Sequence, residues 1–243
     1  MAQDVFESSI LVKTSVLIEV PMMVPSDLQS GESVPLVIGL HGGGGSPEQF
    51  KDIWNDVPEA DFLYVALRAP YPIPDQPAYE WASWTSADTL LMRLAGDLVP
   101  AYVKSAIEAV RLNYIVSAVY LVGFSQGAIY TYVTGMAIPD LLDGLLIFGG
   151  PGLLSPLTTP FIPEPVMSDW VSEDSIPNGS SLRVFIAHGK SDLAVEYRLA
   201  QSSCDILKAN GYSVVFRAFN GGHQVPPIAI LQEAALWIMS PGK

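Results

Sequence analysis

The stretch Val122-Gly123-Phe124-Ser125-Gln126-Gly127 has the form Gly-x-Ser-x-Gly, and its surroundings decide how the whole chain folds. The apolar residues 118–122 are typical of a buried strand, and residues 128–133 can continue as a helix up to Gly135. A serine in a sharp turn between a strand and a helix has a strained backbone, which exposes its hydroxyl above the edge of a sheet. The unpaired N–H groups at the start of the helix suit a developing oxyanion. Because the pentapeptide alone arises by chance in many proteins, its position between strand and helix is what indicates a nucleophile.

Strands and helices alternate along the chain on both sides of this turn. Apolar runs predict strands at 34–40, 61–67, 118–122, 144–148, 182–187 and 212–219, and periodic patterns predict helices from Pro47, at 90–110, after Ser125, at 194–209 and at 226–239. Residues 10–20 are rich in β-branched side chains and predict an entry strand or hairpin. Pro100 predicts a kink or a break within the helix 90–110. The alternation predicts an α/β fold, a mostly parallel central sheet with helices on both faces.

Length and composition predict one domain with a large core. The chain has 243 residues, of which 49% are hydrophobic and only 15% charged, values that favour a buried core over disorder. We therefore expect a single domain over residues 1–243. Residues 151–181 differ from the rest, because they contain six prolines, several acidic residues and no steady period. They predict an irregular insert, since long irregular loops in compact domains are often lids or binding loops.

Net charge and cysteine content narrow the partners and the compartment. The formal charge of −13 argues against a nucleic-acid partner and against attraction to anionic membranes, because no basic stripe is present. A single cysteine, Cys204, excludes an intrachain disulfide, and residues 1–7 lack the regions of a signal peptide. Residues 112–139 carry no charge, but glycines interrupt them, so a buried strand and helix explain them better than a membrane span. We expect a soluble, cytoplasmic protein without stable membrane insertion. Whether it forms a homodimer is left open by the sequence.

Three histidines are candidates for the base that a serine nucleophile requires. His41 opens the glycine-rich run 41–45, where we expect it to brace the loop by hydrogen bonding. His188 ends a predicted strand, where we expect it to shape the following turn. His223 lies between the last predicted strand and the last helix. That loop is at the carboxyl edge of the sheet, on the same side as Ser125, so His223 is the predicted base.

The base in turn needs an acceptor that orients it. Asp192 follows the predicted strand 182–187 and so lies at the same edge of the sheet. Its rivals, Asp169 and Asp174, fall within the irregular insert and not after a strand, which disfavours them. The resulting chain order, serine, aspartate, histidine, is the order of the α/β-hydrolase fold.

Four segments together resemble a known family. They are His41-Gly42-Gly43-Gly44-Gly45-Ser46-Pro47, Gly123-Phe124-Ser125-Gln126-Gly127, His188-Gly189-x-x-Asp192-x-x-Val195 and Gly222-His223. They are similar to the phospholipase/carboxylesterase family of α/β-hydrolases, which includes acyl-protein thioesterases and small bacterial carboxylesterases. The resemblance extends from about Val34 to the C-terminus. It implies Ser125 as nucleophile, His223 as base and Asp192 as the orienting acid, an oxyanion hole from the backbone N–H groups of Gly43 and Gln126, and neither a metal nor an organic cofactor.

Three features depart from the family pattern and leave the substrate open. Glu196 stands where the family usually has proline, the loop 71–84 lacks a glycine pair before its tryptophan, and the insert 151–181 is longer than in compact thioesterases. We expect the pocket to be lined by aromatic residues of the loop and by apolar residues of the insert: Tyr71, Trp81, Trp84, Leu153 and Phe161. The alternative is that these side chains pack in the core or merely cover its helices.

The resemblance implies a serine carboxylesterase that hydrolyses small to medium acyl esters through an acyl-enzyme. The substrate would be a small-molecule ester. An acyl thioesterase, a lysophospholipase or a peptidase using the same site remains open. So does a non-catalytic binding protein on a hydrolase scaffold, although such proteins typically lose a triad member and none is missing here.

Overall fold

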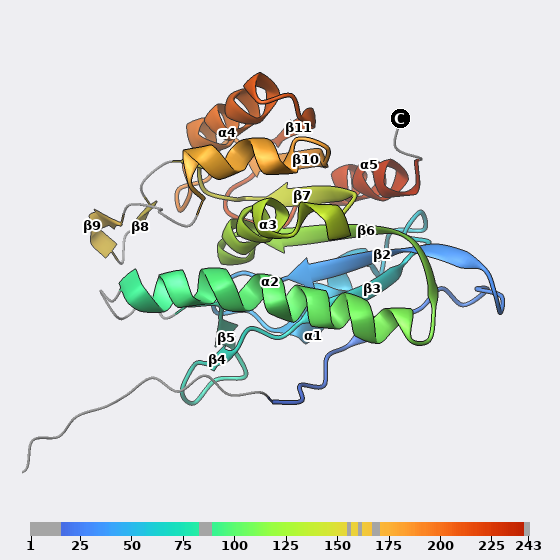
Figure 1. Ribbon diagram of the computed structural model, residues 1–243. Coiled ribbons are helices and arrows are strands. Elements are labelled where there is room, and N and C mark those ends of the chain that lie inside the picture. The colour runs from blue at the N-terminus through green and yellow to red at the C-terminus, as the bar shows by residue number, and fades with distance from the viewer. Residues whose placement is uncertain (1–15, 83–88, 155–156, 160–161, 167–170, 241–243) are drawn as a thin grey trace, which may run out of the picture.

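A computed structural model describes residues 16–82, 89–154, 157–159, 162–166 and 171–240 (Figure 1). Its central feature is a seven-stranded sheet with the strand order β1-β3-β2-β6-β7-β10-β11. The strands of this sheet are β1 (Met22–Met23), β2 (Ser33–Leu40), β3 (Leu63–Leu67), β6 (Ile115–Phe124), β7 (Gly144–Phe148), β10 (Arg183–Gly189) and β11 (Ser213–Phe219). Strand β1 pairs antiparallel with β3, and every other neighbouring pair is parallel. The sheet is therefore mostly parallel, as the sequence predicts.

Helices cover both faces of the sheet (Figure 1). The helices are α1 (Pro47–Lys51), α2 (Thr89–Arg111), α3 (Gln126–Ala137), α4 (Tyr197–Ala209) and α5 (Ile228–Met239). Side chains of α2, α3 and α4 belong to one buried cluster, and those of α1 and α5 belong to the other. Strands β2, β3, β7 and β10, at the centre of the sheet, are almost entirely buried, which is why they read as nearly continuous apolar runs.

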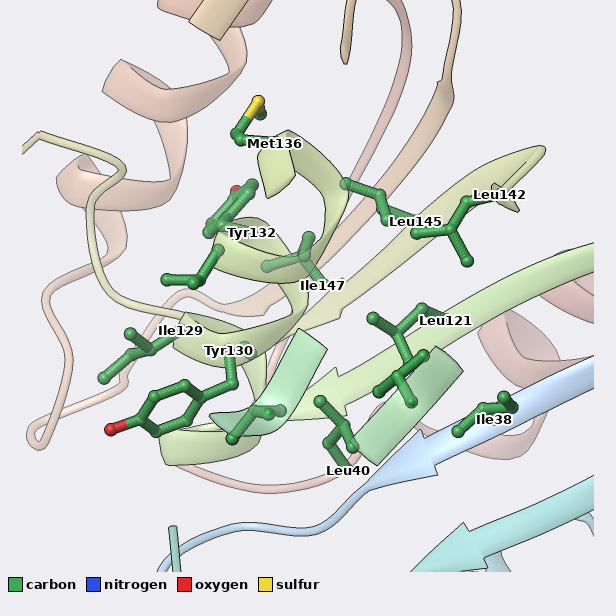
Figure 2. Packing of buried hydrophobic residues seen from close by; sticks show 14 of the residues in the cluster. Ile38, Leu40, Leu121, Ile129, Tyr130, Tyr132, Met136, Leu142, Leu145 and Ile147 are labelled. Carbon is green, nitrogen blue, oxygen red and sulfur yellow. The ribbon is translucent and has the colours of Figure 1, made fainter. Parts of the chain in front are cut away.

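Helix α3 packs at the centre of the first cluster (Figure 2). Ile129, Tyr132 and Met136 of the helix belong to the same buried cluster as the strand residues Leu121 and Ile147. Full burial of one such aliphatic side chain contributes about 1.5–3 kcal/mol. This packing holds the helix that follows Ser125, so the turn itself is rigidly supported.

Most of the predicted elements are present, and the differences have physical reasons. Pro100 lies inside α2 and does not break it, because Val99, Val103 and Ile107 are buried and hold the helix against the sheet. Residues 16–20 form no strand, and residues 10–15 lie outside the described residues.

Short elements occur where the sequence predicts irregular chain. The insert contains strands β8 (Leu157–Thr159) and β9 (Ile162–Val166) and the 3₁₀ helix η3 (Glu173–Gly179). The aromatic loop contains β4 (Tyr71–Pro72) and β5 (Tyr79–Glu80), and two further 3₁₀ turns are η1 (Asp52–Trp54) and η2 (Pro139–Leu141).

Candidate active site

Ser125 occupies the turn between β6 and α3 in a backbone conformation that L-residues rarely adopt. Its φ is 53° and its ψ is −117°. Strain of this kind persists only where the surroundings over-determine it. Here the Ser125 N–H donates to Phe148 O of β7 at 3.0 Å, and helix α3 begins at the next residue. The turn therefore presents the serine side chain at the carboxyl edge of the sheet.

The two glycines of the motif are required by close contacts. A Cβ atom at Gly123 would lie 2.4 Å from Gly127 O, and one at Gly127 would lie 2.0 Å from Leu40 O. Real Cβ atoms essentially never come this close to backbone oxygen. Only glycine at both positions lets β6, α3 and the end of β2 meet.

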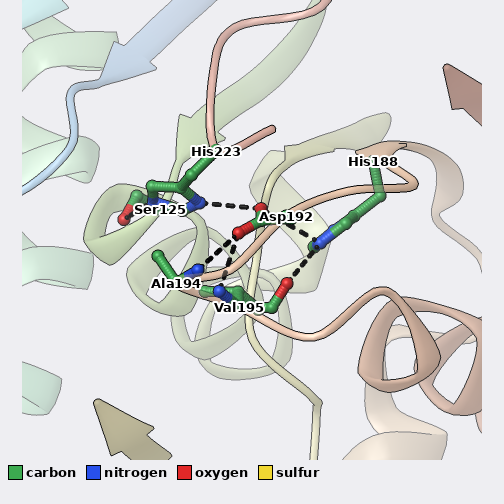
Figure 3. A network of polar contacts seen from close by, with 6 residues as sticks. All are labelled: Ser125, His188, Asp192, Ala194, Val195 and His223. Atoms are coloured by element: carbon green, nitrogen blue, oxygen red, sulfur yellow. Dashed lines mark hydrogen bonds and ion pairs between the residues drawn. The ribbon is translucent and has the colours of Figure 1, made fainter. Parts of the chain in front are cut away.

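The structure brings Ser125, His223 and Asp192 together (Figure 3). His223 Nε2 lies 2.8 Å from Ser125 Oγ, and His223 Nδ1 lies 2.8 Å from Asp192 Oδ2. The Phe124 ring packs beside the imidazole, with ring centroids 5.0 Å apart. With Nδ1 protonated and donating to the carboxylate, Nε2 can accept the serine proton, which is the arrangement that nucleophilic catalysis by serine requires.

Two adjacent loops place Asp192 and His223 side by side. Parallel pairing of β10 with β11 continues past the strand ends, where the Lys190 N–H donates to Phe219 O and the Ser191 N–H donates to Gly221 O, both at 2.9 Å. A Cβ atom at Gly189 would lie 2.3 Å from Gly222 O, so glycine is needed where the loops touch. The sheet register thus sets the distance between Asp192 and His223.

The Asp192 carboxylate is buried and fully hydrogen-bonded. Oδ1 accepts the backbone N–H groups of Ala194 and Val195 at 2.9 and 2.8 Å, which leaves Oδ2 for His223. The side chain has no exposed surface. Charge-assisted hydrogen bonds of this kind offset the cost of burying the carboxylate and fix its orientation.

His188 lies on the other side of the same carboxylate (Figure 3). Its Nε2 is 2.9 Å from Val195 O and 3.3 Å from Asp192 Oδ2. Burial lowers the pKa of His188, an effect that the hydrogen bond to Val195 opposes. A neutral imidazole that donates from Nε2 therefore ties the Asp192–Val195 turn to strand β10.

His41 holds the glycine-rich loop 41–45 (hereafter the glycine loop) in place through hydrogen bonds. Its Nε2 accepts the Ala69 N–H at 3.2 Å, so its Nδ1 carries the proton and donates to Gly42 O at 2.7 Å. Burial also lowers the pKa of His41. Neither His41 nor His188 contacts Ser125 through a hydrogen bond among the described residues.

The glycine loop passes directly beside Ser125. A Cβ atom at Gly42 would lie 3.4 Å from Ser125 Cβ and 3.0 Å from the Phe124 ring. Within the described part of the chain, the backbone N–H groups of Gly43 and Gln126 donate to no protein acceptor. With respect to the described residues, these two N–H groups are thus free, and they lie in the segments adjoining Ser125.

The structure places two of the predicted pocket residues in the core. Trp81 is completely buried between the rings of His41 and Tyr130, and its indole N–H donates to His41 O at 2.8 Å. Leu153 is 2% exposed, and its backbone N–H donates to Ser203 Oγ. Both side chains belong to the core cluster and offer no surface to a substrate, because the loop and the insert each turn inward at these points.

The roles of the remaining predicted pocket residues stay predictions. Tyr71 is half-buried in β4, and Trp84 and Phe161 lie outside the described residues. Sequence reasoning also missed the side chain of Gln126, which is 3% exposed and makes two hydrogen bonds described below. A long polar side chain at the start of an apolar helix is the signal, because a buried amide must find partners.

Over the described ranges, no group of three or more histidine, cysteine, aspartate or glutamate residues could hold a metal ion. None of the helices within those ranges combines the length and the apolar character needed to cross a membrane.

Comparisons with known proteins agree with this architecture. The model of the phospholipase/carboxylesterase family matches residues 28–236. Acyl-protein thioesterase 1 of Neurospora crassa is 29% identical over 128 residues, which are 52% of this chain and 45% of that relative. The matched segment therefore spans less than half the length of the relative.

Solved structures give the same fold. The crystal structure of esterase PE8 is similar with a TM-score of 0.66 and 21% identity, covering 91% of this chain and 99% of that one. TT1662 from Thermus thermophilus is similar with a TM-score of 0.68 and 19% identity, covering 91% and 94%. These likenesses confirm the α/β-hydrolase fold that the sequence predicts.

Proposed function

Because the chain belongs to the phospholipase/carboxylesterase family, we propose that it is a serine carboxylesterase that hydrolyses small to medium acyl esters. The observation that carries this proposal is the pair of 2.8 Å contacts from His223, one to Ser125 Oγ and one to Asp192 Oδ2, at a strained turn. Such a constellation activates a hydroxyl that is otherwise a poor nucleophile.

The reaction begins with attack on the ester carbonyl. As Ser125 Oγ forms a bond to the carbonyl carbon, His223 Nε2 takes the hydroxyl proton, and Asp192 stabilises the imidazolium through Nδ1–H. The carbonyl oxygen becomes an oxyanion, which the N–H groups of Gly43 and Gln126 bind. Donors held in place before the reaction stabilise this charge without reorganising.

Collapse of the tetrahedral intermediate releases the alcohol. The carbonyl re-forms, the bond to the alkoxy oxygen breaks, and His223 gives its proton to that oxygen. Water then attacks the acyl-enzyme while His223 takes its proton. The bond between the acyl carbon and Ser125 Oγ breaks, His223 returns the proton to Oγ, and the acid product leaves. All proton transfers pass through one imidazole.

The acyl part of the substrate is a small to medium chain, and Tyr71, Trp84 and Phe161 are the residues proposed to line its pocket. A thioester is the nearest alternative substrate, because the relative from Neurospora crassa carries the name acyl-protein thioesterase 1. A lysophospholipase or a peptidase would use the same serine and histidine.

Covalent labelling tests the nucleophile. A fluorophosphonate probe should label the folded wild-type protein and not Ser125→Ala, and mass spectrometry should place the adduct on Ser125. A folded protein that stays unlabelled would favour a binding protein on a hydrolase scaffold. Rates for p-nitrophenyl esters from acetate to decanoate, measured beside an acyl thioester of matched length, would then rank ester against thioester.

A further inference from the structure

The side-chain amide of Gln126 binds two consecutive backbone groups of a distant segment. Its Oε1 accepts the Trp81 N–H at 2.8 Å, and its Nε2 donates to Ala82 O at 3.0 Å. The amide uses both its acceptor and a donor, and it is almost entirely buried. The start of α3 is therefore fastened to the segment 79–82 by a two-point contact.

The segment 79–82 in turn holds the glycine loop. The Trp81 indole N–H donates to His41 O at 2.8 Å. At the other end of the segment, Gly44 N–H donates to Tyr79 O and Tyr79 N–H donates to Gly45 O, both at 2.9 Å. The backbone on each side of Gly43 is thus hydrogen-bonded to the segment that Gln126 grips.

We propose that the Gln126 side chain is a positioning group for the oxyanion hole. The inference rests on the proposed function. One of the two N–H donors belongs to Gln126 itself, and the other belongs to Gly43. The chain of contacts from the Gln126 amide through Trp81 and Tyr79 sets where the glycine loop lies relative to the start of α3.

The oxyanion hole needs such a positioning group for a geometric reason. Oxyanion donors act only when they point at the place where charge develops, within about 0.5 Å of the productive position. The glycine loop cannot hold such a position by itself, because glycines leave its backbone free to adopt many conformations. The two hydrogen bonds of the buried Gln126 amide supply this constraint.

Glutamine is the residue that fits this task. Asparagine is one methylene shorter, and glutamate has no donor for Ala82 O. A methionine would keep the volume and the backbone N–H but leave the Trp81 N–H and Ala82 C=O unpaired in the interior.

Steady-state kinetics of three variants test the proposal. Gln126→Met removes both side-chain bonds. Trp81→Phe removes only the indole bond to His41 O while keeping an aromatic ring. Gln201→Met is the matched control, because Gln201 is exposed on α4, away from the segment. Active sites are counted by fluorophosphonate labelling carried to completion, so that kcat refers to folded sites alone.

The value of kcat per labelled site distinguishes a positioning role of Gln126 from a purely structural one. For Gln126→Met we expect kcat per labelled site to fall about 10- to 100-fold while KM changes by less than about threefold, because the donors are displaced and not removed. The affinity for an aryl trifluoromethyl ketone, whose hemiketal oxyanion occupies the hole, should fall by the same factor as kcat/KM. Trp81→Phe should show a smaller loss of the same kind, and Gln201→Met should match the wild type.

Two results would overturn the inference. One is a Gln126→Met protein whose kcat per labelled site stays within about twofold of the wild type. This includes a protein whose total activity falls only because fewer of its sites are labelled. The other, decisive also if Gln126→Met does not fold, is a Trp81→Phe protein with wild-type kcat and ketone affinity. A wild-type protein without Ser125-dependent turnover would instead refute the proposed function and this inference together. That result differs from the two above because it concerns the wild type and not the variants.

Discussion

Gly127 packs directly against Leu40, so that a Cβ atom on Gly127 would lie 2.0 Å from the carbonyl oxygen of Leu40. The contact joins the first turn of α3 to the end of β2, where the glycine loop begins. It therefore places the predicted nucleophile and the predicted oxyanion loop next to each other by backbone packing alone.

Alanine at this contact should disrupt the fold. We expect Gly127→Ala to abolish soluble expression or to lower the melting temperature strongly, because neither backbone can move away. Gly96→Ala is the matched control: the nearest atom to its Cβ would be 4.0 Å away, and alanine in a helix is favoured over glycine by about 0.5–1 kcal/mol. Thermal unfolding measures both, and a Gly127→Ala protein as stable as the wild type would contradict the close contact.

The tautomer of His223, that is, which ring nitrogen carries the proton, should depend on the carboxylate of Asp192. In Asp192→Asn the amide oxygen can still accept the N–H groups of Ala194 and Val195, which turns the NH₂ group toward His223 Nδ1. The imidazole must then place its proton on Nε2, where it cannot accept the serine proton. We expect kcat for p-nitrophenyl butyrate to fall by about 10⁴-fold, with the circular dichroism spectrum unchanged. A loss below tenfold would remove Asp192 from the proposed mechanism.

The losses of kcat caused by alanine at Ser125 and at His223 should not combine in the double variant. Each single alanine variant is expected to lose about 10³-fold or more in kcat, since both residues serve one chemical step. The double variant should lose about as much as either one. If the two factors multiplied, the residues would act in separate steps and the proposed mechanism would be wrong.

Stability should fall at acid pH because of buried histidines. Burial lowers the pKa of His188 below its ordinary value of 6.5, so near and below that pH the unfolded chain binds more protons than the folded protein. Stability from this group is complete above about pH 6.5 and declines as the pH falls toward the lower folded pKa. We expect urea unfolding of the wild type to show this decline and His188→Gln to show a shallower one, with His41 contributing what remains. Equal slopes in both proteins would mean that His188 does not titrate differently in the two states.

Leu153 should matter for stability and not for chain length. The side chain is buried in the core cluster, and its removal leaves a cavity. We expect Leu153→Ala to lower the free energy of unfolding by about 2–5 kcal/mol and to leave the ratio of short-ester to long-ester kcat/KM unchanged. Tyr71→Ala, at a half-buried position, is the variant expected to change that ratio. A changed ratio in Leu153→Ala would return that residue to the pocket.

Local patterns in the sequence were enough to predict the fold class and most of the elements. Strands β2, β3, β7 and β10 and the second half of β6 are apolar because both of their faces are covered, and that property is visible without knowing the partners. The family resemblance is confirmed by the family model, which matches residues 28–236; the motifs that carry it lie at strand ends, where glycine and polar residues interrupt the apolar runs. The three residues of the predicted triad follow from the shared carboxyl edge of a parallel sheet, and their catalytic roles stay a prediction.

Contacts between distant segments decided the rest. Nothing in the local pattern separates Trp81, which is buried under the glycine loop, from an aromatic residue that faces a substrate. Gln126 likewise gave no local sign that its amide reaches a segment more than forty residues away in the chain. Periodicity and turn propensity depend on neighbours in sequence, whereas burial and hydrogen-bond partners depend on how the segments pack, and so only the tertiary structure determined which polar and aromatic groups meet around Ser125.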